Sequence, residues 1–406
     1  MHTPLNSRGF HSKMKLITDK QFEAVDNCLT YNIPFALFAL PGHKECRFFA
    51  SRPDKDGECH AFADDDNIKA DGCDTFFISR FNADEPYVAG IRPEYDENTL
   101  SDLIAELKDI YPASDVRPLR MSTRRESYSA AFIKMRHRLR THGGKVVLSR
   151  HESIFSTRYI TEVVDEYIAS APDTFRYFCY TPETGLWFGA TPELLLSADA
   201  AGNTFRTMAL AGTQSAGSDA DWDDKNLLEH RYVADYITHS LSNLGLTVDA
   251  SPMEELYTGA VKHLCTPISA TGHADPIEVI DTLSPTPAVA GIPVDVAIAE
   301  IDTLESHRRQ CYAGVVGVRI DNCIYAFVNL RCAFAAFGVF GTDGGWIYNL
   351  YAGGGIMPDS VEEDEWKETA DKTAVLSSII TDCNPSMTRV YDLRDGEFIQ
   401  YQGSKA

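Results

Sequence analysis

The chain has 406 residues, and 59 acidic side chains against 37 basic ones leave a formal net charge of −22. With 44% hydrophobic and 24% charged residues, its composition is that of a globular protein and excludes a disordered or collagen-like chain. The charge argues against nucleic acid or an anionic membrane surface as a partner, because both need a basic face. The one local basic cluster lies at 136–150, much of it in a helix-like stretch.

Export and membrane insertion are not expected. The first thirty residues lack the basic start, apolar stretch and cleavage site of a signal peptide. No window approaches the run of about 18 apolar residues that a transmembrane helix needs. The ten cysteines form no C-x-x-C pair, which is typical of reduced, buried thiols in a chain of this length. The sequence therefore predicts a cytoplasmic protein without a membrane partner.

Hydrophobic periodicity and turn residues predict the secondary structure, most clearly after residue 115. An acidic run at 64–66 lacks the spacing of a calcium-binding loop, so a solvated loop is predicted there. In chain order the predicted elements are a strand at 75–79, a helix at 127–142, a strand at 145–149, an antiparallel meander at 175–211, helices at 223–244 and 293–304, strands at 314–320, 325–333 and 346–351, and a helix from 360 to 380.

The last helix carries the first chemical signal. Ser360 and Glu363 have the spacing of a capping box at its start. Further along, Glu365, Glu368 and Lys372 fall on one helical stripe, which on an arbitrary helix is usually an exposed face with ion pairs. A glycine run at 353–355 lies directly upstream, and glycine amides beside a helix start can hold an anion.

Other candidate residues have a plain structural interpretation when taken alone. Glu229 could join Glu368 around a hard cation such as Mg²⁺, which takes oxygen ligands. His230 is interpreted as a hydrogen-bonded helix residue in the core. Lys145 could be a charge at the start of an edge strand, and Glu193 an exposed carboxylate where a strand begins.

Taken together, ten short motifs follow one another in a fixed order, which is far more specific than any single motif. They are K-V-V-L-S-R at 145–150, A-T-P-E-L-L-L at 190–196, A-L-A-G-T at 209–213, K-x-x-x-E-H at 225–230, H-L-x-T-P at 263–267, S-P-T-P-A-V at 284–289, Y-A-G-V-V-G at 312–317, N-L-R-C-A at 329–333, Y-A-G-G-G-I at 351–356 and E-W-x-E-T-x-x-K at 365–372.

Over residues 120–380 the chain thereby resembles the chorismate-utilising enzymes. This family includes isochorismate synthases, salicylate synthases and the chorismate-binding subunits of anthranilate and aminodeoxychorismate synthases. The resemblance implies an α+β fold, one large domain of face-to-face antiparallel sheets flanked by helices. It implies a chorismate-binding catalytic core at 116–385, with 1–115 as an N-terminal part of the same fold and 386–406 as a C-terminal tail.

The resemblance also implies roles for individual residues. Glu229 and Glu368 resemble the Mg²⁺ ligands of the family, and Glu365 resembles a carboxylate linked to the ion through water. The residues expected to bind the substrate are Thr213, His263, Tyr312, Arg331, Gly353, Gly355 and Lys372. Many relatives carry Glu where this chain has Asn226, so its Mg²⁺ affinity is expected to be weaker. Chorismate is a dianion, so an acidic protein needs these cationic groups and the metal to bind it.

The reaction is indicated by Lys145, because family members that add water to ring C2 resemble this chain in having Lys there, whereas those that add ammonia usually have Gln. Lys145 is expected to take a proton from the water, and a protonated Glu193 to give one to the departing C4 hydroxyl. The resemblance thus favours isochorismate synthase, an isomerase that serves menaquinone or siderophore biosynthesis. Salicylate synthase and a catalytically idle anion-binding subunit remain as alternatives, and the chain is expected to be a monomer or a homodimer.

Overall fold

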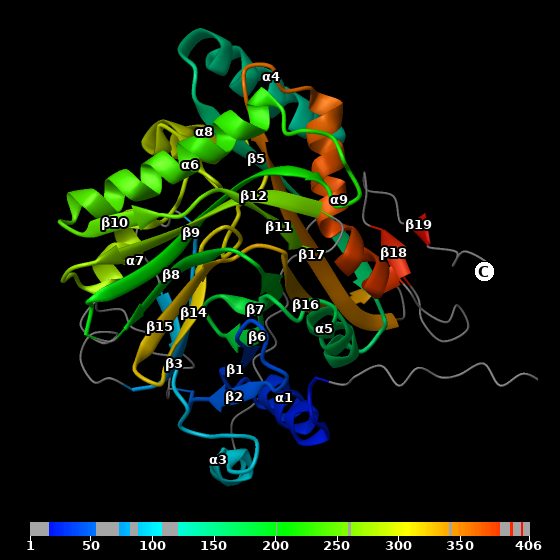
Figure 1. Cartoon of the computed structure of the whole chain (residues 1–406). Coiled ribbons are helices and arrows are strands. Elements are labelled where there is room, and N and C mark those ends of the chain that lie inside the picture. Colours follow the sequence, from blue (N-terminus) through cyan, green and yellow to red (C-terminus); the bar gives the residue numbers. More distant parts are fainter. Residues whose placement is uncertain are drawn as a thin grey trace, which may run out of the picture.

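Two large antiparallel β-sheets face each other in the computed structural model, with helices on their outer sides (Figure 1). The structure describes residues 16–53, 73–81, 88–107, 121–199, 201–258, 261–340, 343–381, 390–392 and 399–400. The acidic run at 64–66 lies outside these residues. Within them, no helix is long and apolar enough to cross a membrane. The α+β fold of facing antiparallel sheets expected from the resemblance is confirmed.

Each sheet takes strands from both ends of the chain. The first sheet, in spatial order, contains β19 (Ile399–Gln400), β18 (Val390–Asp392), β5 (Lys145–Ser156), β17 (Asp343–Ile356), β16 (Cys332–Phe340), β7 (Gly185–Thr191), β6 (Phe175–Thr181), β1 (Phe35–Ala39) and β2 (Arg47–Ala50), with β13 (Gly291–Ile292) also paired to β5. The second contains β10 (Thr247–Ala250), β12 (Val261–Thr271), β9 (Thr204–Ser215), β8 (Leu194–Asp199), β15 (Cys323–Val328), β14 (Val315–Ile320), β3 (Thr75–Ser79) and β4 (Val88–Ile91), with β11 (Glu254–Thr258) paired to β12.

The helices cover the outer faces of the sheets (Figure 1). Helix α6 packs on β9 and β12, and α9 packs on β17 and β5. The described helices are α1 (Asp19–Tyr31), α3 (Leu100–Glu106), α4 (Arg125–His142), α5 (Ile160–Ala169), α6 (Asp224–Asn243), α7 (Pro276–Leu283), α8 (Val294–Leu304) and α9 (Glu362–Thr381). The predicted helices at 127–142, 223–244 and 293–304 are therefore confirmed to within two residues.

The first sheet is buried on both faces, which explains its nearly continuous apolar strands. In β1, Phe35 and Leu37 belong to the core beneath α1 and α5, whereas Ala36 and Phe38 belong to the core between the sheets. Successive side chains of a strand point to opposite faces, so a doubly covered strand needs apolar residues at every position. Between the sheets, Phe175 of β6 stacks on Phe327 of β15 with ring centroids 4.5 Å apart.

Two sequence predictions about strands are wrong in the same way. The predicted meander at 175–211 is divided, because β6 and β7 belong to the first sheet while β8 and β9 belong to the second. The predicted strand at 325–333 is also divided, between β15 in the second sheet and β16 in the first. The chain therefore crosses between the sheets at residues 192–193 and again at 329–331.

These two sheet crossings lie side by side. The backbone N–H of Ala190 donates to Arg331 O at 3.1 Å, and that of Val328 donates to Glu193 O at 3.0 Å. Arg331 has a φ of +48°, a left-handed conformation that breaks the strand without a glycine. Glu193 and Arg331, both expected in the site, are thus held next to each other where the sheets meet.

The interpretation of the last helix and its glycines also needs correction. Gly353–Gly355 lie within β17, paired with β5, and not in a loop at a helix start. Helix α9 begins at Glu362, and the Ser360 hydroxyl donates to Glu365 Oε1 at 2.7 Å instead of capping Glu363. The capping box is therefore wrong, although the helix that it marked is present.

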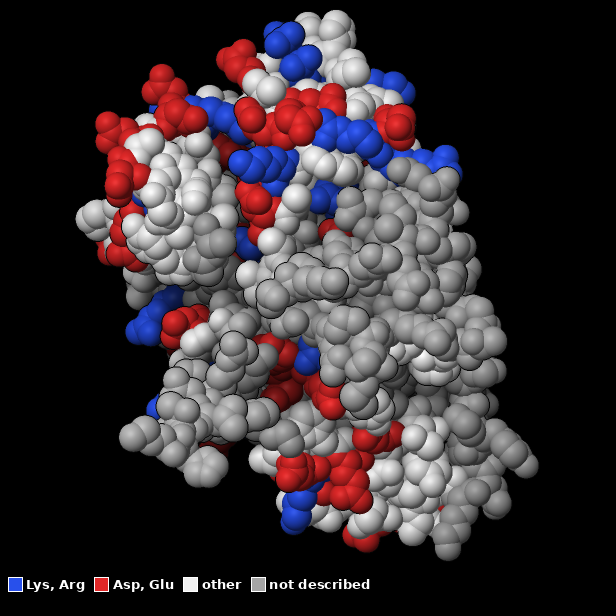
Figure 2. All heavy atoms as spheres, turned by 90° about the vertical axis from the view of Figure 1, so that its right-hand side faces the viewer, with Lys and Arg blue, Asp and Glu red and all other residues white. Residues whose placement is uncertain are grey.

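Some basic side chains of α4 pair with acidic residues, whereas Arg136 and Arg140 donate to the backbone carbonyls of Ser360 and Pro358. Arg125 pairs with Glu362 at 3.0 Å and Glu363 at 2.9 Å, and Arg138 pairs with Glu300 at 2.7 Å. Figure 2 shows blue and red side chains interspersed over this upper end of the molecule. Such a mixed surface lacks the continuous positive potential that phosphate binding requires.

Candidate active site

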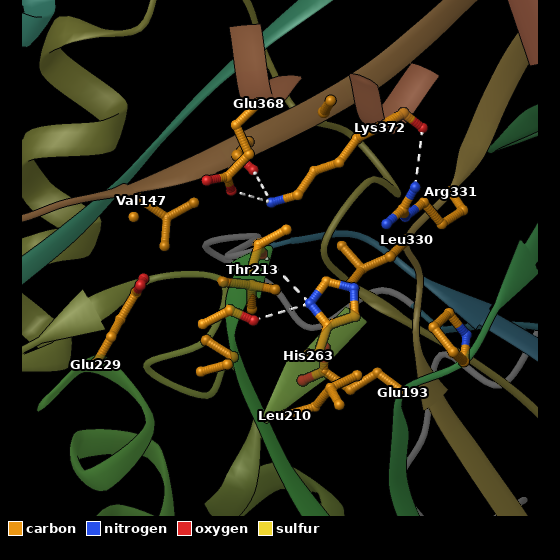
Figure 3. A pocket seen from close by; sticks show the side chains of 18 of the residues that line it. Val147, Glu193, Leu210, Thr213, Glu229, His263, Leu330, Arg331, Glu368 and Lys372 are labelled. Carbon is orange, nitrogen blue, oxygen red and sulfur yellow. Dashed lines mark hydrogen bonds and ion pairs between the residues drawn. The ribbon is translucent and has the colours of Figure 1, made fainter. Parts of the chain in front are cut away.

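A pocket lies between the two sheets, beside the sheet crossings (Figure 3). It takes side chains from strands of both sheets and from α6 and α9. The residues that line it are Lys145, Val147, Pro192, Glu193, Leu210, Ala211, Gly212, Thr213, Glu229, His263, Ala288, Val289, Tyr312, Leu330, Arg331, Tyr351, Ala352, Gly353, Gly355, Glu368 and Lys372. All residues predicted for the site are among them, except Glu365. Distant parts of the sequence therefore meet here as the motif order indicated.

Lys145 is buried at the floor of the pocket and is not on an edge strand. Its side chain is 1% exposed, and its Nζ lies 2.8 Å from Glu229 Oε1. The strand β5 that carries it runs between β17 and β18. Gly355 makes room for this ion pair, because a Cβ atom there would lie 1.8 Å from Glu229 Oε1 and 2.8 Å from Lys145 Cε.

Glu193 reaches the pocket from the first sheet crossing. It is 4% exposed, and its carboxyl group makes no hydrogen bond with the described residues. Burial raises the pKa of Glu193 to about 8, against the opposing effect of Lys145 and Lys372. The carboxyl group is therefore mostly protonated at neutral pH and can act as a proton donor.

Lys372 is the centre of a polar network at the middle of α9. Its Nζ donates to Glu368 Oε1 at 2.6 Å and to Gly353 O at 2.8 Å, and its carbonyl accepts from Arg331 Nη1 at 3.1 Å. Burial disfavours the charged form of Glu368, but Lys372, Lys225 and His263 together outweigh it and lower the pKa of this carboxyl group overall. Glu368 and Lys372 of the predicted stripe on α9 thus face the pocket, and Glu365 is buried beside it, so the stripe is not a solvated surface.

Glu365 lies behind the pocket wall, where Lys225 neutralises it at 2.5 Å. Burial raises the pKa of Glu365 to about 7 despite Lys225, and Glu368 adds to the rise. Lys225 was not predicted as a site residue, although it begins the K-x-x-x-E-H motif. Its partner is 140 residues away in the sequence, so no local pattern connects the two.

Arg331 and Tyr312 form another part of the pocket wall. Both are largely buried, and Tyr167 donates its hydroxyl to Arg331 O at 2.7 Å, which holds the second sheet crossing in place. The Tyr312 ring stacks on Tyr351 with centroids 5.4 Å apart. Its hydroxyl lies 3.0 Å from where a Cβ atom of Gly353 would be. A guanidinium, a phenol and glycine amides therefore converge in this part of the pocket.

His263 is neutral and presents an acceptor. Burial, and then the charges of Arg331 and Lys372, lower its pKa to about 3. Its Nδ1 lies 3.0 Å from Gly212 O and 3.3 Å from Thr213 Oγ1. A carbonyl oxygen only accepts, so Nδ1 carries the proton and Nε2 remains as an acceptor in this tautomer. His263 can thus accept a hydrogen bond from a hydroxyl in the pocket.

Two neighbouring residues of α6 have structural roles. His230 is 4% exposed, and its Nε2 lies 2.8 Å from Thr266 Oγ1, as its core interpretation predicted. Asn226, where the resemblance led us to expect Glu in many relatives, bonds to two neighbouring segments. Its Oδ1 accepts from Thr213 N at 3.0 Å and its Nδ2 donates to Asp223 Oδ1 at 2.8 Å. Asn226 therefore connects α6 to β9 and adds no charge to the glutamate cluster.

The carboxylate oxygens in and beside the pocket are the kind of ligand that a hard cation takes. In their present positions, however, no three potential ligands among the described residues are close enough to bind one ion together. Cβ atoms at Gly354 and Gly355 would lie 2.9 Å from Glu365 Oε2 and 1.8 Å from Glu229 Oε1. Glu365 Oε2 is buried without a hydrogen-bond partner. An oxygen-rich donor set with an unsatisfied buried oxygen fits Mg²⁺.

The chain belongs to the chorismate binding enzyme family, whose model matches residues 99–381. It is 32% identical to the isochorismate synthase MenF of Haemophilus influenzae over 209 residues, which are 48% of this chain and 46% of that enzyme. The match thus spans about half the length of this curated relative. The resemblance read from the ten motifs is confirmed at the level of the family.

Solved structures share the fold. The menaquinone-specific isochorismate synthase MenF of Escherichia coli has a TM-score of 0.65 at 21% identity, with 92% of each chain covered. Anthranilate synthase component I of Streptococcus pneumoniae has a TM-score of 0.57 at 18% identity, with 86% of this chain and 91% of that chain covered. Because enzymes named for different reactions share it, the fold alone does not define the reaction.

Proposed function

We propose that the protein is an Mg²⁺-dependent isochorismate synthase, which adds water to C2 of chorismate as the C4 hydroxyl departs. The observation that carries this proposal is the pair of Lys145 and Glu193 in one pocket, a buried lysine from β5 and a neutral carboxyl group from the sheet crossing. Family members that add water resemble this chain at Lys145. The sequence likeness to an enzyme named isochorismate synthase supports the same reaction.

Binding of the substrate is assigned to the part of the pocket that Arg331, Tyr312 and Lys372 line. Arg331 offers a planar fork for a carboxylate, and Lys372 and the Tyr312 hydroxyl offer further donors. The pairing of β16 with β17 ends at Leu350. Beyond that residue β16 no longer covers this edge of β17, so the backbone N–H groups of Gly353 and Gly355 are available to the substrate on the pocket side. A dianion could thereby bind to a protein whose formal net charge is −22.

The acid and base act from different strands. Lys145 would act as the neutral amine, after its ion pair with Glu229 is broken and its proton is lost to solvent; it then accepts a proton from the attacking water, and Glu193, protonated at neutral pH, donates one to the C4 hydroxyl. Each turnover therefore leaves one proton more on Lys145 and one fewer on Glu193, and exchange with solvent restores both. Nε2 of the neutral His263 and the Thr213 hydroxyl are available to orient the ring hydroxyls.

Glu229 and Glu368 are proposed as the Mg²⁺ ligands, with Glu365 linked to the ion through water. When bound, Mg²⁺ would neutralise the repulsion among these carboxylates and the carboxylate of the substrate. Lys145 Nζ lies 2.8 Å from Glu229 Oε1, and Lys372 Nζ lies 2.6 Å from Glu368 Oε1. These two lysines thus help to position the glutamate side chains.

The test is to incubate the purified protein with chorismate and Mg²⁺ and to separate the products. Isochorismate is expected. Salicylate with pyruvate would identify a salicylate synthase, and absence of turnover would identify an idle subunit. Lys145→Gln should be inactive, whereas Lys134→Gln, on the exposed face of α4, should be as active as the wild type. This matched pair excludes activity from a contaminating host enzyme.

A further inference from the structure

A buried arginine outside the pocket joins two of its walls. Arg309 is 3% exposed, and its guanidinium makes four hydrogen bonds. Nη1 donates to Val289 O at 2.7 Å, Nη2 donates to Val147 O at 2.8 Å and to Glu305 Oε1 at 2.7 Å, and Nε donates to Glu305 Oε2 at 3.0 Å. Val147 and Val289 both line the pocket, whereas Arg309 and Glu305 do not.

The two walls held by Arg309 are otherwise connected by few backbone contacts. One wall is the start of β5, which carries Lys145, and the other is the segment 288–292. Strand β13 pairs with β5 only through Gly291 and Ile292, and Val147 N donates to Ala290 O at 2.9 Å. Gly291 permits this approach, since a Cβ atom there would lie 2.2 Å from Lys145 O.

Glu305 completes the arrangement on the side of β5. Its Oε1 accepts from the backbone N–H of Ser149 at 2.7 Å, while both of its oxygens accept from Arg309. Burial disfavours the charge on Arg309, but Glu305 more than compensates and raises the pKa of the guanidinium. The backbone of Arg309 is also connected to a pocket residue, because the N–H of Tyr312 donates to the carbonyl of Arg309 at 3.0 Å.

We propose that Arg309 and Glu305 form a positioning clasp that fixes the start of β5 against the segment 288–292. The clasp sets where Lys145 stands relative to the apolar wall formed by Ala288 and Val289. It acts through the backbone and touches no substrate. Its effect on turnover rests on the proposed function, whereas its effect on the two walls does not.

The geometry makes lysine a poor replacement for arginine here. A planar guanidinium reaches Val147, Val289 and Glu305 at once because its donors form a rigid fork. A lysine ammonium keeps the positive charge that Glu305 needs, but it is a single point at the end of a flexible stem. Arg309→Lys therefore tests whether the hydrogen bonds of the guanidinium matter beyond the neutralisation of Glu305.

The kinetic test compares Arg309→Lys and the double variant Arg309→Met/Glu305→Gln with the wild type. The double variant removes both buried charges, so it leaves none unpaired, and the amide introduced by Glu305→Gln keeps an acceptor for Ser149 N. Both variants should show kcat lower by roughly 10²-fold, the loss expected for misplacement by about 1 Å, with little change in KM.

Arg176→Met is the control, since Arg176 is 1% exposed and donates to backbone carbonyls of Leu40 and His43 away from the pocket. Per folded molecule, it should keep full activity.

Hydrogen exchange provides a readout that does not depend on activity. In the double variant, peptides covering 145–149 and 288–292 should exchange faster, while those of β9 and β12 should not change. Unchanged protection in both walls would overturn the clasp, whatever the protein catalyses. Faster exchange with an unchanged kcat would overturn its positioning role. An inactive wild type would refute the proposed function alone, because the exchange result would still decide whether the clasp exists.

Discussion

Because folding raises the pKa of Glu193, ionisation of this buried carboxyl group should destabilise the folded protein. A carboxyl group that titrates at about 8 in the folded protein and near 4.5 when unfolded favours the folded state at low pH. That contribution is complete below pH 4.5 and is lost as the pH rises through 8. Glu193→Gln removes the titration, so the variant should become progressively more stable than the wild type with rising pH.

The size of the effect follows from the two pKa values. At about 1.4 kcal/mol per pH unit, the wild type should be less stable than Glu193→Gln by up to about 1 kcal/mol at pH 5, about 3 kcal/mol at pH 7 and about 5 kcal/mol at pH 9. These values are upper bounds, because local relaxation and water entry reduce the penalty of burying a charge. Activity should fall by about 10²-fold to 10⁴-fold, since an amide cannot deliver a proton.

The assay is urea denaturation of both proteins at pH 5, 7 and 9, with product formation measured on the same preparations. Glu23→Gln, on the exposed side of α1, serves as the matched control and should change neither quantity. The reasoning is refuted if the difference in urea midpoint between Glu193→Gln and the wild type does not grow from pH 5 to pH 9. It is also refuted if the variant stays fully active.

Three further outcomes are expected. Lys145→Gln should lower isochorismate formation by at least about 10²-fold while chorismate binding survives, and wild-type turnover in ¹⁸O-labelled water should place label in the new C2 hydroxyl; unlabelled product would exclude Lys145 as a base for water. Arg331→Ala should mainly raise KM, by roughly 30-fold to 4,000-fold, because it removes a carboxylate partner of both the bound substrate and the transition state; lower kcat at constant KM would contradict this. Chelation of Mg²⁺, Glu229→Ala and Glu368→Ala should each abolish turnover with the fold retained by circular dichroism, and activity in excess chelator would refute the metal assignment.

Local patterns in the sequence predicted α4, α6, α8 and α9 and several of the strands, but not α1, α3, α5 or α7. The long helix α6 has an Asp223 cap and an apolar stripe, both of which depend only on neighbouring residues. The partition of strands between the sheets was not predicted, because it depends on distant partners. Nothing local marks residue 331 as a left-handed position, since φ values near +48° usually call for Gly or Asn.

The candidate site was predicted by motif order rather than by local patterning. Single residues such as Glu193 looked like exposed carboxylates, and only their joint occurrence pointed to a pocket. The ion pair of Lys225 with Glu365 and the clasp of Arg309 were not found, because each joins segments whose proximity exists only in the folded chain. The glycines at 353–355 were recognised as important, but they were interpreted as amides beside a helix start and not as part of a strand.

The paired sheet crossings have a consequence for motion. Two covalent links join the sheets at neighbouring points, and backbone hydrogen bonds connect the links to each other. The backbone that carries Glu193 and Arg331 is therefore restrained on several sides, because each crossing continues into both sheets and is also hydrogen-bonded to the other crossing. Neither residue can be displaced without breaking these hydrogen bonds or moving strands of both sheets.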